Sequence, residues 1–304
     1  MNRRNFHTSA TVLGASSLLS IVGCNKPEVA PSRPARSNFK MGYQLFSVNE
    51  DMKRDPIGTL QALKEMGYED FEIYGFDPDA LTYYGIKAED FATTLEELDL
   101  TVTSGHYGFT DYLDRSDTEL RKYVAACIQG AKTLRSPYIT WPWLAPRFRN
   151  MDGYKKMASK LNPIGEQIKD AGLTFAYHNH GFEFDDHGGT SGYELILSAT
   201  DPALVKLQMD MYWVMHSGTT TPKELVQQHP GRYVMWHIKD MDAVTRDYSE
   251  LGRGAINYLN VLPAPQESGL QYYYIEQGGN FATSAIESAR SSGRYMQEHL
   301  VSLL

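Results

Sequence analysis

The stretch "GYKKMASKLNPIGEQIKDAGLTFAYHNH", residues 153–180, contains a helical pattern followed directly by a strand pattern. The helical part ends at Gly172, a residue type that commonly stops a helix. The segment 173–180 is then typical of a strand. Successive strand side chains alternate between two faces, so His178 and His180 point to the same side. The stretch therefore predicts a helix–strand unit with two histidines where its strand ends.

The same alternation recurs throughout residues 39–304, where Gly67 and Gly269 also stand between a helix and a strand. Strands that alternate with helices form a parallel sheet, and eight repeats predict a single-domain (β/α)8 TIM barrel. No Gly-x-Gly-x-x-Gly follows the first strand, so nothing indicates a dinucleotide-binding fold. The expected strands are residues 40–46, 70–75, 101–108, 137–143, 173–180, 204–210, 233–240 and 271–277.

The composition is that of a globular chain of 304 residues, with 42% hydrophobic and 22% charged residues. The formal net charge of −8 argues against a nucleic-acid partner, because phosphate binding relies on basic patches. Cys127 is the only cysteine after residue 24, which excludes a disulfide framework. It lies in the helical pattern of residues 120–134 and is predicted to be a small buried hydrophobe.

Residues 1–24 have the pattern of an export signal. Arg3 and Arg4 resemble a twin-arginine signal, and an apolar run too short to span a bilayer follows them. "SIVGC", which ends at Cys24, resembles the cleavage box of bacterial lipoproteins. We expect an exported, periplasmic protein that is attached to the membrane only through a lipidated Cys24. An ordinary cleaved signal peptide is the alternative.

The segment 25–38 is rich in proline and polar residues, which predicts a flexible tether. Residues 39–304 then form the predicted catalytic barrel. The sequence leaves the oligomeric state open.

Polar and aromatic side chains gather at the predicted carboxyl ends of the strands, where TIM barrels place their active sites. Each of them alone is equally compatible with a structural role. Histidines and carboxylates nevertheless recur at this same end of four consecutive strands, whereas chance would place them at both ends. The candidates in strand order are Gln44, Glu72, His106, Trp141, Trp143, His178, His180, Asp210, Tyr212, Trp213, His237, Lys239 and Glu276.

Imidazole and carboxylate groups from strands five to eight form a ligand set that suits Mn²⁺, Zn²⁺, Fe²⁺ or Co²⁺. A ring of such ligands predicts one divalent metal ion with open positions for substrate oxygens.

Four motifs resemble the sugar isomerase/epimerase family of xylose isomerase-like TIM barrels. The resemblance covers the chain from about residue 39 onward and is most specific in the second half. The motifs are "LTFAYHNHGFEF" (173–184), "MDMYWV" (209–214), "WHIKDMD" (236–242) and "YYYIEQ" (272–277).

The resemblance implies one metal ion held by Glu, Asp, His and Glu from strands five to eight. Asp210, His237 and Glu276 match three of these positions. His178 stands where the family has its strand-five glutamate, and His180 is the alternative ligand from this strand. The change puts in doubt a mechanism in which two glutamates exchange the proton.

The family includes sugar isomerases, ketose epimerases, inosose dehydratases and, more distantly, apurinic-site endonucleases. The resemblance implies proton abstraction next to the carbonyl of a non-phosphorylated sugar or keto-sugar, through a metal-stabilised enediolate. Candidate bases are Glu276, His180 and His106, and Lys239 would hold the oxyanion or act as an acid. Glu72 is a further catalytic candidate, as the partner of Glu276 in a two-carboxylate glycosidase.

Trp141, Trp143, Tyr212 and Trp213 are candidates to stack on a sugar ring, and Gln44 is a further candidate for substrate binding. Packing at the barrel mouth is the alternative role for the four aromatic residues.

Two other functions remain open. One is β-elimination from a keto-sugar or an oxidised glycoside at the same site. The other is a non-catalytic, exported sugar-binding lipoprotein, which the replacement of the strand-five glutamate favours. The segment 182–189 is expected to be a solvated loop, and the segment 250–257 a lid or a connector.

Overall fold

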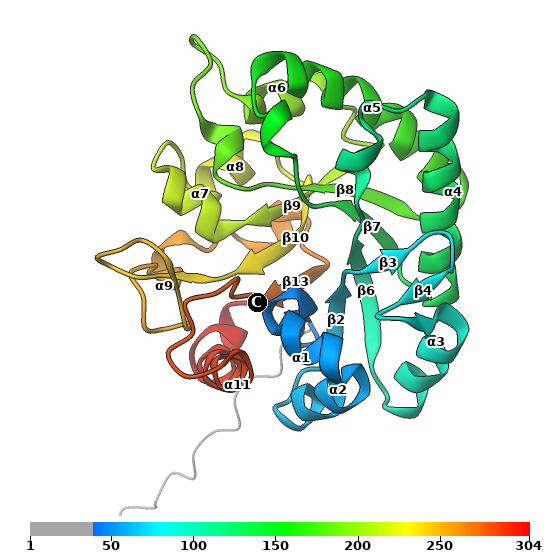
Figure 1. The fold of residues 1–304 in the computed structure, drawn as a ribbon. Coiled ribbons are helices and arrows are strands. Elements are labelled where there is room, and N and C mark those ends of the chain that lie inside the picture. Colours follow the sequence, from blue (N-terminus) through cyan, green and yellow to red (C-terminus); the bar gives the residue numbers. More distant parts are fainter. Residues whose placement is uncertain (1–38) are drawn as a thin grey trace, which may run out of the picture. The chain divides into compact units, whose positions relative to one another are not determined.

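The computed structural model describes residues 39–304, so the expectations for residues 1–24 and 25–38 lie outside the described residues. Eight parallel strands close into a barrel, which confirms the predicted (β/α)8 fold (Figure 1). The barrel strands are β1 (Gly42–Gln44), β2 (Asp70–Ile73), β6 (Thr101–His106), β7 (Tyr138–Trp141), β8 (Thr174–His178), β9 (Val205–Asp210), β10 (Tyr233–Ile238) and β13 (Tyr272–Ile275).

Helices lie around the ring of strands (Figure 1). The α-helices are α1 (Asn49–Arg54), α2 (Pro56–Glu65), α3 (Ala88–Glu97), α4 (Asp117–Thr133), α5 (Met151–Asp170), α6 (Gly192–Ala199), α7 (Met211–Ser217), α8 (Pro222–Gln228), α9 (Tyr258–Val261), α10 (Pro265–Ser268) and α11 (Ala285–Tyr295). The 3-10 helices are η1 (Leu45–Val48), η2 (Phe109–Tyr112), η3 (Pro146–Phe148), η4 (Phe182–Phe184) and η6 (Val301–Leu303), and η5 (Met296–Leu300) is a π-helix.

Two small antiparallel sheets interrupt the repeat after barrel strands. Strands β3 (Phe76–Asp77), β4 (Thr82–Tyr83) and β5 (Ile86–Lys87) follow β2, and β11 (Asp240–Met241) pairs with β12 (Tyr248–Ser249) after β10. Both additions follow the carboxyl end of a barrel strand, so they extend the end of the barrel at which the predicted site lies.

The helix and the strand of residues 153–180 form as predicted, except that strand β8 ends at His178, so His180 lies beyond the strand. The Asn150 side chain accepts a 3.0 Å hydrogen bond from the backbone N–H of Gly153 and caps the start of α5. The helix ends at Asp170, and Gly172 adopts a φ of +82°, a conformation that strains residues carrying a Cβ. Strand β8 then begins at Thr174.

The register of the strands places the site residues beside one another. Gln44 of β1 lies opposite Glu72 of β2, and Asp210 of β9 lies opposite His237 of β10. His178 at the end of β8 faces Gln208 of β9. Residues that are far apart in the sequence therefore meet inside the carboxyl end of the barrel.

A second cluster of buried hydrophobic residues contains Tyr138, Met235 and Tyr274, and the Tyr274 ring lies 5.9 Å from that of His237. Cys127 in α4 is fully buried, and burial raises the pKa of its thiol well above the usual value. The thiol is therefore a small hydrophobic group, as predicted. Of the helices within residues 39–304, none is both long enough and apolar enough to cross a membrane.

Candidate active site

Glu72 is the centre of a buried hydrogen-bond network inside the barrel. Its Oε1 atom accepts hydrogen bonds of 2.6 Å from Ser104 Oγ and from Gln208 Nε2, and its Oε2 atom accepts one of 2.6 Å from Gln44 Nε2. His106 Nε2 lies 3.0 Å from the same Oε2 atom. A buried carboxylate with this many donors is held in its charged form and in a fixed orientation.

His237 is held between two carboxylates. Its Nε2 atom lies 2.5 Å from Glu72 Oε2, and its Nδ1 atom lies 2.5 Å from Glu276 Oε2. Burial lowers the pKa of His237, but the two adjacent carboxylates outweigh this effect and raise the pKa to about 9. Burial raises the pKa of Glu72, but the charges of His106 and His237 hold it well below its usual value. Glu72 and His237 therefore form a buried ion pair, with a carboxylate and an imidazolium.

Lys239 joins the remaining two carboxylates. Its ammonium lies 2.6 Å from Asp210 Oδ2 and 2.7 Å from Glu276 Oε2, and its side chain is only 3% exposed. Burial lowers the pKa of Lys239, but the charges of the two carboxylates raise it by more, so the net pKa lies above its usual value. Burial raises the pKa of Glu276, but the charges of Lys239 and His237 together hold this pKa below its usual range. Glu276 therefore stays ionised at neutral pH.

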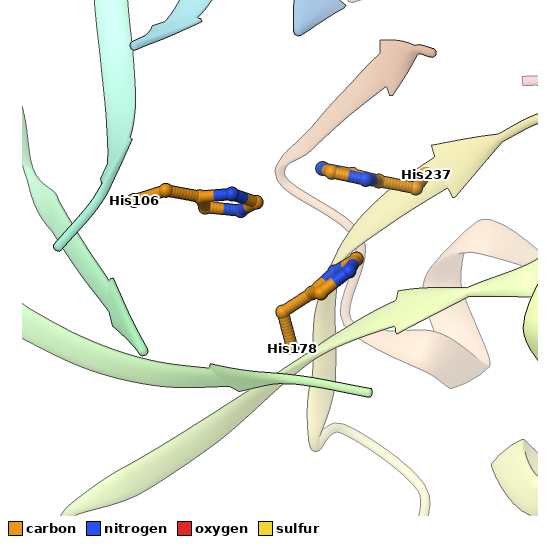
Figure 2. A group of neighbouring side chains, drawn as sticks. All are labelled: His106, His178 and His237. Atoms are coloured by element: carbon orange, nitrogen blue, oxygen red, sulfur yellow. The ribbon is translucent and has the colours of Figure 1, made fainter. Parts of the chain in front are cut away.

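Three histidine rings converge from β6, β8 and β10 (Figure 2). The ring centroid of His178 lies 5.1 Å from that of His106 and 4.6 Å from that of His237. His178 Nε2 lies 3.7 Å from Asp210 Oδ2, while its buried Nδ1 atom has no hydrogen-bond partner. Burial, followed by the charges of neighbouring histidines, lowers the pKa of His178, so this imidazole is neutral.

The donor atoms of this cluster fit a divalent cation. Ligand atoms of Asp210, His237 and Glu276 lie within 4.8 Å of one another, and those of His106, His178 and His237 form a second such group. A metal ion bound to His237 would displace the proton of this imidazole. The cluster would then carry two net negative charges, from three carboxylates (Glu72, Asp210 and Glu276) and one ammonium (Lys239), and a divalent cation would balance them. Glu72 would then orient His237 through its second nitrogen, as carboxylates do beside metal-bound histidines.

His180 lies just beyond the end of β8, with its ring 4.9 Å from that of His178. Its ring stacks on Phe182 at a centroid distance of 5.2 Å and approaches Trp213 at 5.7 Å. Its buried Nδ1 atom has no hydrogen-bond partner, and burial lowers its pKa. Asn179, between the two histidines, binds the backbone N–H and C=O of Asp210 through its side-chain amide. The turn after β8 is thus fixed to the end of β9.

Glu183 corrects the expectation that residues 182–189 form a solvated loop. Its side chain is fully buried in η4 and accepts hydrogen bonds from the Tyr177 hydroxyl at 2.6 Å and from the backbone N–H of His180 at 2.8 Å. Burial raises its pKa to about 7. The signal in the sequence was the pair of phenylalanines that flank this acid directly after a strand. Residues 185–189 are largely exposed, as expected for a loop.

The cluster opens into a cavity of about 660 Å³. Five of the predicted polar residues line it, and so do aromatic residues that the sequence did not single out. The polar residues are His106, His178, His180, Lys239 and Glu276, and the added aromatic residues are Phe46, Tyr74, Phe76, Tyr107 and Tyr248. Glu72, Asp210 and His237 lie behind this lining and are fully buried.

Of the four aromatic candidates for stacking, only Trp143 lines the cavity. Trp141 is 1% exposed, stacks on Phe109 at 5.3 Å and donates its indole N–H to the carbonyl of Trp143. Tyr212 is buried, and its hydroxyl donates to the carbonyl of Arg246. These contacts give Trp141 and Tyr212 the packing role that was the alternative.

Two further candidates support the site from outside the cavity. Trp213 packs against His180 and does not line the cavity. Gln44 lies beneath the lining, where its amide binds Glu72.

Asp240 holds the segment 250–257 in place. Its carboxylate accepts backbone hydrogen bonds from Gly252, Gly254 and Ile256. This segment is therefore anchored at several points, which favours the connector over the lid.

Comparison with known proteins agrees with this geometry. The family model described as xylose isomerase-like TIM barrel matches residues 60–280. An inosose dehydratase from Clostridium beijerinckii is 29% identical over 97 residues, a match that spans 31% of this chain and 30% of that protein. The chain thus covers less than a third of this curated relative.

Two solved structures extend the comparison to the whole barrel. A sugar phosphate isomerase/epimerase from Parabacteroides distasonis is 26% identical, with a TM-score of 0.74, over 88% of this chain and 96% of that one. The IOLI protein, whose crystal structure contains a zinc atom, shares the fold at 17% identity and a TM-score of 0.66, over 86% of this chain and 97% of that one. The dehydratase and the isomerase/epimerase are enzymes, which confirms the expectation that this chain is an enzyme. Because the family model covers most of its length, the chain belongs to the xylose isomerase-like TIM barrel family.

Proposed function

We propose that the protein is an isomerase or epimerase that moves a proton next to the carbonyl of a non-phosphorylated keto-sugar. The observation that carries the proposal is the position of Glu276. This carboxylate lines the cavity while its Oε2 atom contacts both Lys239 and His237. Glu276 thus connects the cavity, where the substrate would bind, with a buried cluster of acids and bases, which is the arrangement that proton transfer requires.

Asp210, His237 and Glu276, together with His178, would hold one divalent metal ion. Such an ion would supply Lewis-acid polarisation of a carbonyl. The neighbouring structure of a relative that contains zinc supports this assignment.

The side chains themselves supply the proton chemistry. Lys239 lines the cavity with a permanently charged ammonium, which can donate a hydrogen bond to a developing oxyanion. His180 lines the same cavity and has an unpartnered Nδ1 atom, so its neutral ring can accept a proton. Glu276 is the second group able to accept a proton. Two acceptors in one cavity allow removal and return of a proton at different positions.

The charge of the cavity supports a substrate without phosphate. Among the residues of the described range 39–304 that line it, Lys239 is the only lysine or arginine, and its ammonium already pairs with two carboxylates. A phosphate would also meet Asp111 and Glu276. The same lining offers hydrogen-bond acceptors and aromatic faces to a neutral sugar.

The test is exchange of the α-proton in deuterated water, followed by NMR. We expect neutral keto-sugars to incorporate deuterium in the presence of the protein and divalent metal, while the corresponding sugar phosphates exchange more slowly. Faster exchange with phosphates would overturn the substrate assignment, and no exchange with any keto-sugar would overturn the proton-transfer function.

β-Elimination is the second candidate, supported by the partial match to an inosose dehydratase. It begins with the same removal of a proton but ends with loss of the substituent on the adjacent carbon. Product analysis separates the two, because elimination gives an unsaturated ketone whereas isomerisation conserves the composition of the sugar.

A further inference from the structure

The cavity changes in character from its floor to its mouth. On the floor, His178, Lys239 and Glu276 are buried and polar. At the mouth, the residues Phe46 and Trp143 are 45% and 39% exposed. The total volume of about 660 Å³ lies in the middle of the range of roughly 300–1,000 Å³ that accommodates drug-sized ligands. This is more room than a single sugar ring needs.

The two exposed aromatic rings are unusual in this protein. Within residues 39–304, the only large hydrophobic side chains that are exposed besides Phe46 and Trp143 are Val244, Leu259 and Leu303. None of these three lines the cavity, whereas both aromatic residues do. Single exposed hydrophobic residues need no explanation, but two aromatic rings on the rim of one cavity indicate a binding surface.

Phe46 is held in place and connected to the reactive centre. Its ring contacts Tyr74 edge to face at 5.3 Å. Its backbone N–H donates a 3.0 Å hydrogen bond to Gln44 Oε1, and the Nε2 atom of the same amide binds Glu72. One glutamine therefore fixes both the rim aromatic residue and the central carboxylate.

Trp143 is also ordered before any ligand binds. The guanidinium of Arg149 lies over its ring at 5.1 Å, and Arg149 Nε donates a 2.9 Å hydrogen bond to the carbonyl of Leu144. The carbonyl of Trp143 accepts the indole N–H of Trp141. Binding to a rim that is already ordered avoids most of the entropy that is lost when side chains are immobilised.

The acid Asp111 also lines this cavity, and the Arg149 guanidinium over Trp143 is a second charged group near the mouth. Asp111 is exposed and belongs to the same cavity lining as Phe46 and Trp143. A carboxylate accepts hydrogen bonds from hydroxyl groups and repels phosphate, whereas aromatic faces pack against the apolar face of a ring. The mouth therefore suits a second neutral ring.

We infer that the substrate is a glycoside, whose oxidised sugar ring enters the polar floor while a second ring, a sugar or an aryl aglycone, packs against Phe46 and Trp143. The assignment of the floor to the oxidised ring rests on the proposed function. The second ring rests on the rim alone.

Ligand-observed NMR titrations test the second ring without requiring turnover. The probes are methyl glucoside, phenyl glucoside and a glucose disaccharide, with wild-type protein and the variants Phe46→Ala, Trp143→Ala and Leu259→Ala. We expect phenyl glucoside or the disaccharide to bind more tightly than methyl glucoside. Each rim variant should reduce that preference by roughly 2- to 12-fold, the usual range for one aromatic contact. Leu259→Ala, which changes an exposed residue outside the cavity, should leave it unchanged.

Equal affinity of all three probes, or a preference that both rim variants retain, would overturn the inference. A preference for phenyl glucoside indicates an aryl aglycone, and a preference for the disaccharide indicates a second sugar. Exchange of the α-proton in free keto-sugars without any preference among the probes would leave the proposed function standing and remove the glycoside. The expected preference without α-proton exchange in any keto-sugar or keto-glycoside would leave the second-ring site standing and remove the proposed function.

Discussion

Asp70 and Glu72 lie two residues apart on β2 and are almost identically buried, yet their surroundings differ. Asp70 receives side-chain hydrogen bonds from two hydroxyl groups, namely those of Thr101 at 2.7 Å and Thr103, and lies near the charge of Lys40. Glu72 receives them from amides, a serine hydroxyl and the two imidazoles of His106 and His237.

The pKa values of the two carboxyl groups diverge accordingly. Burial raises the pKa of Asp70 to about 7, because the two threonine hydroxyl groups, the more distant charge of Lys40 and a backbone hydrogen bond from Phe71 offset only part of the lost hydration. Burial acts on Glu72 in the same direction, but the charges of His106 and His237 hold its pKa well below the usual value. Charged partners, rather than burial or hydrogen bonds alone, thus distinguish the reactive end of the barrel from its closed end.

The largest expected effect comes from making the same chemical change at both ends. Glu276→Gln removes a charge from the cavity and should lower the rate of α-proton exchange by about 10²- to 10⁴-fold, the usual contribution of a positioned acid or base. Asp70→Asn should leave the rate unchanged. Equal losses in the two variants, measured by NMR under identical conditions, would show that the comparison has no catalytic meaning.

Asp70→Asn should instead change stability in a way that depends on pH. The folded pKa of about 7 lies above the ordinary value of 3.8, so folding favours the protonated form. This contribution is fully present below about pH 4 and is lost as the pH rises through 7. The variant, which stays neutral, should gain up to about 4 kcal/mol over the wild type at pH 8, and the gain should vanish towards pH 4. Urea unfolding across this range measures it, and a gain that is constant with pH would contradict the assignment.

Glu72→Gln tests the partner carboxylate. The change removes the charge that orients His237 through Nε2, and loss of such a partner typically lowers metal affinity by about 10- to 100-fold. Competition dialysis with Mn²⁺ or Zn²⁺ measures the affinity, with Asp70→Asn as the matched control. Unchanged affinity would mean that Glu72 has no part in positioning His237.

The smallest expected effect is that of Tyr274→Phe, which removes a hydroxyl group directed toward the closed end. Its hydroxyl lies 2.6 Å from Thr103 Oγ1, in the network that surrounds Asp70. Loss of one such hydrogen bond should reduce the free energy of unfolding by about 0.5–1.5 kcal/mol and leave proton exchange intact. A large loss of activity would show that the closed end communicates with the site.

Much of the fold was predictable because its signals are local. Gly67, Gly172 and Gly269 end their helices with positive φ angles, and the strand patterns between them give the repeat. The polar residues at the strand ends converge because a parallel barrel brings all carboxyl ends together, which is how Asp210 and His237 meet.

The remaining features depend on register, which is not a local property. Ser104 and Gln208 bind Glu72 from within their strands rather than from the ends, and a shift in register between Phe71 and Glu72 sets the pairing with β6. The aromatic rim depends on a small sheet and on loops whose course the sequence did not predict. Trp141, although it ends its strand, turns into the core.

The metal content of the protein, purified without chelator, tests the central claim most directly. Wild type and Asp70→Asn should each carry close to one equivalent of a divalent transition metal, and His237→Ala should carry almost none. Absence of metal from the wild type even after titration, or full retention in His237→Ala, would contradict the assignment of Asp210, His237 and Glu276 as a metal site.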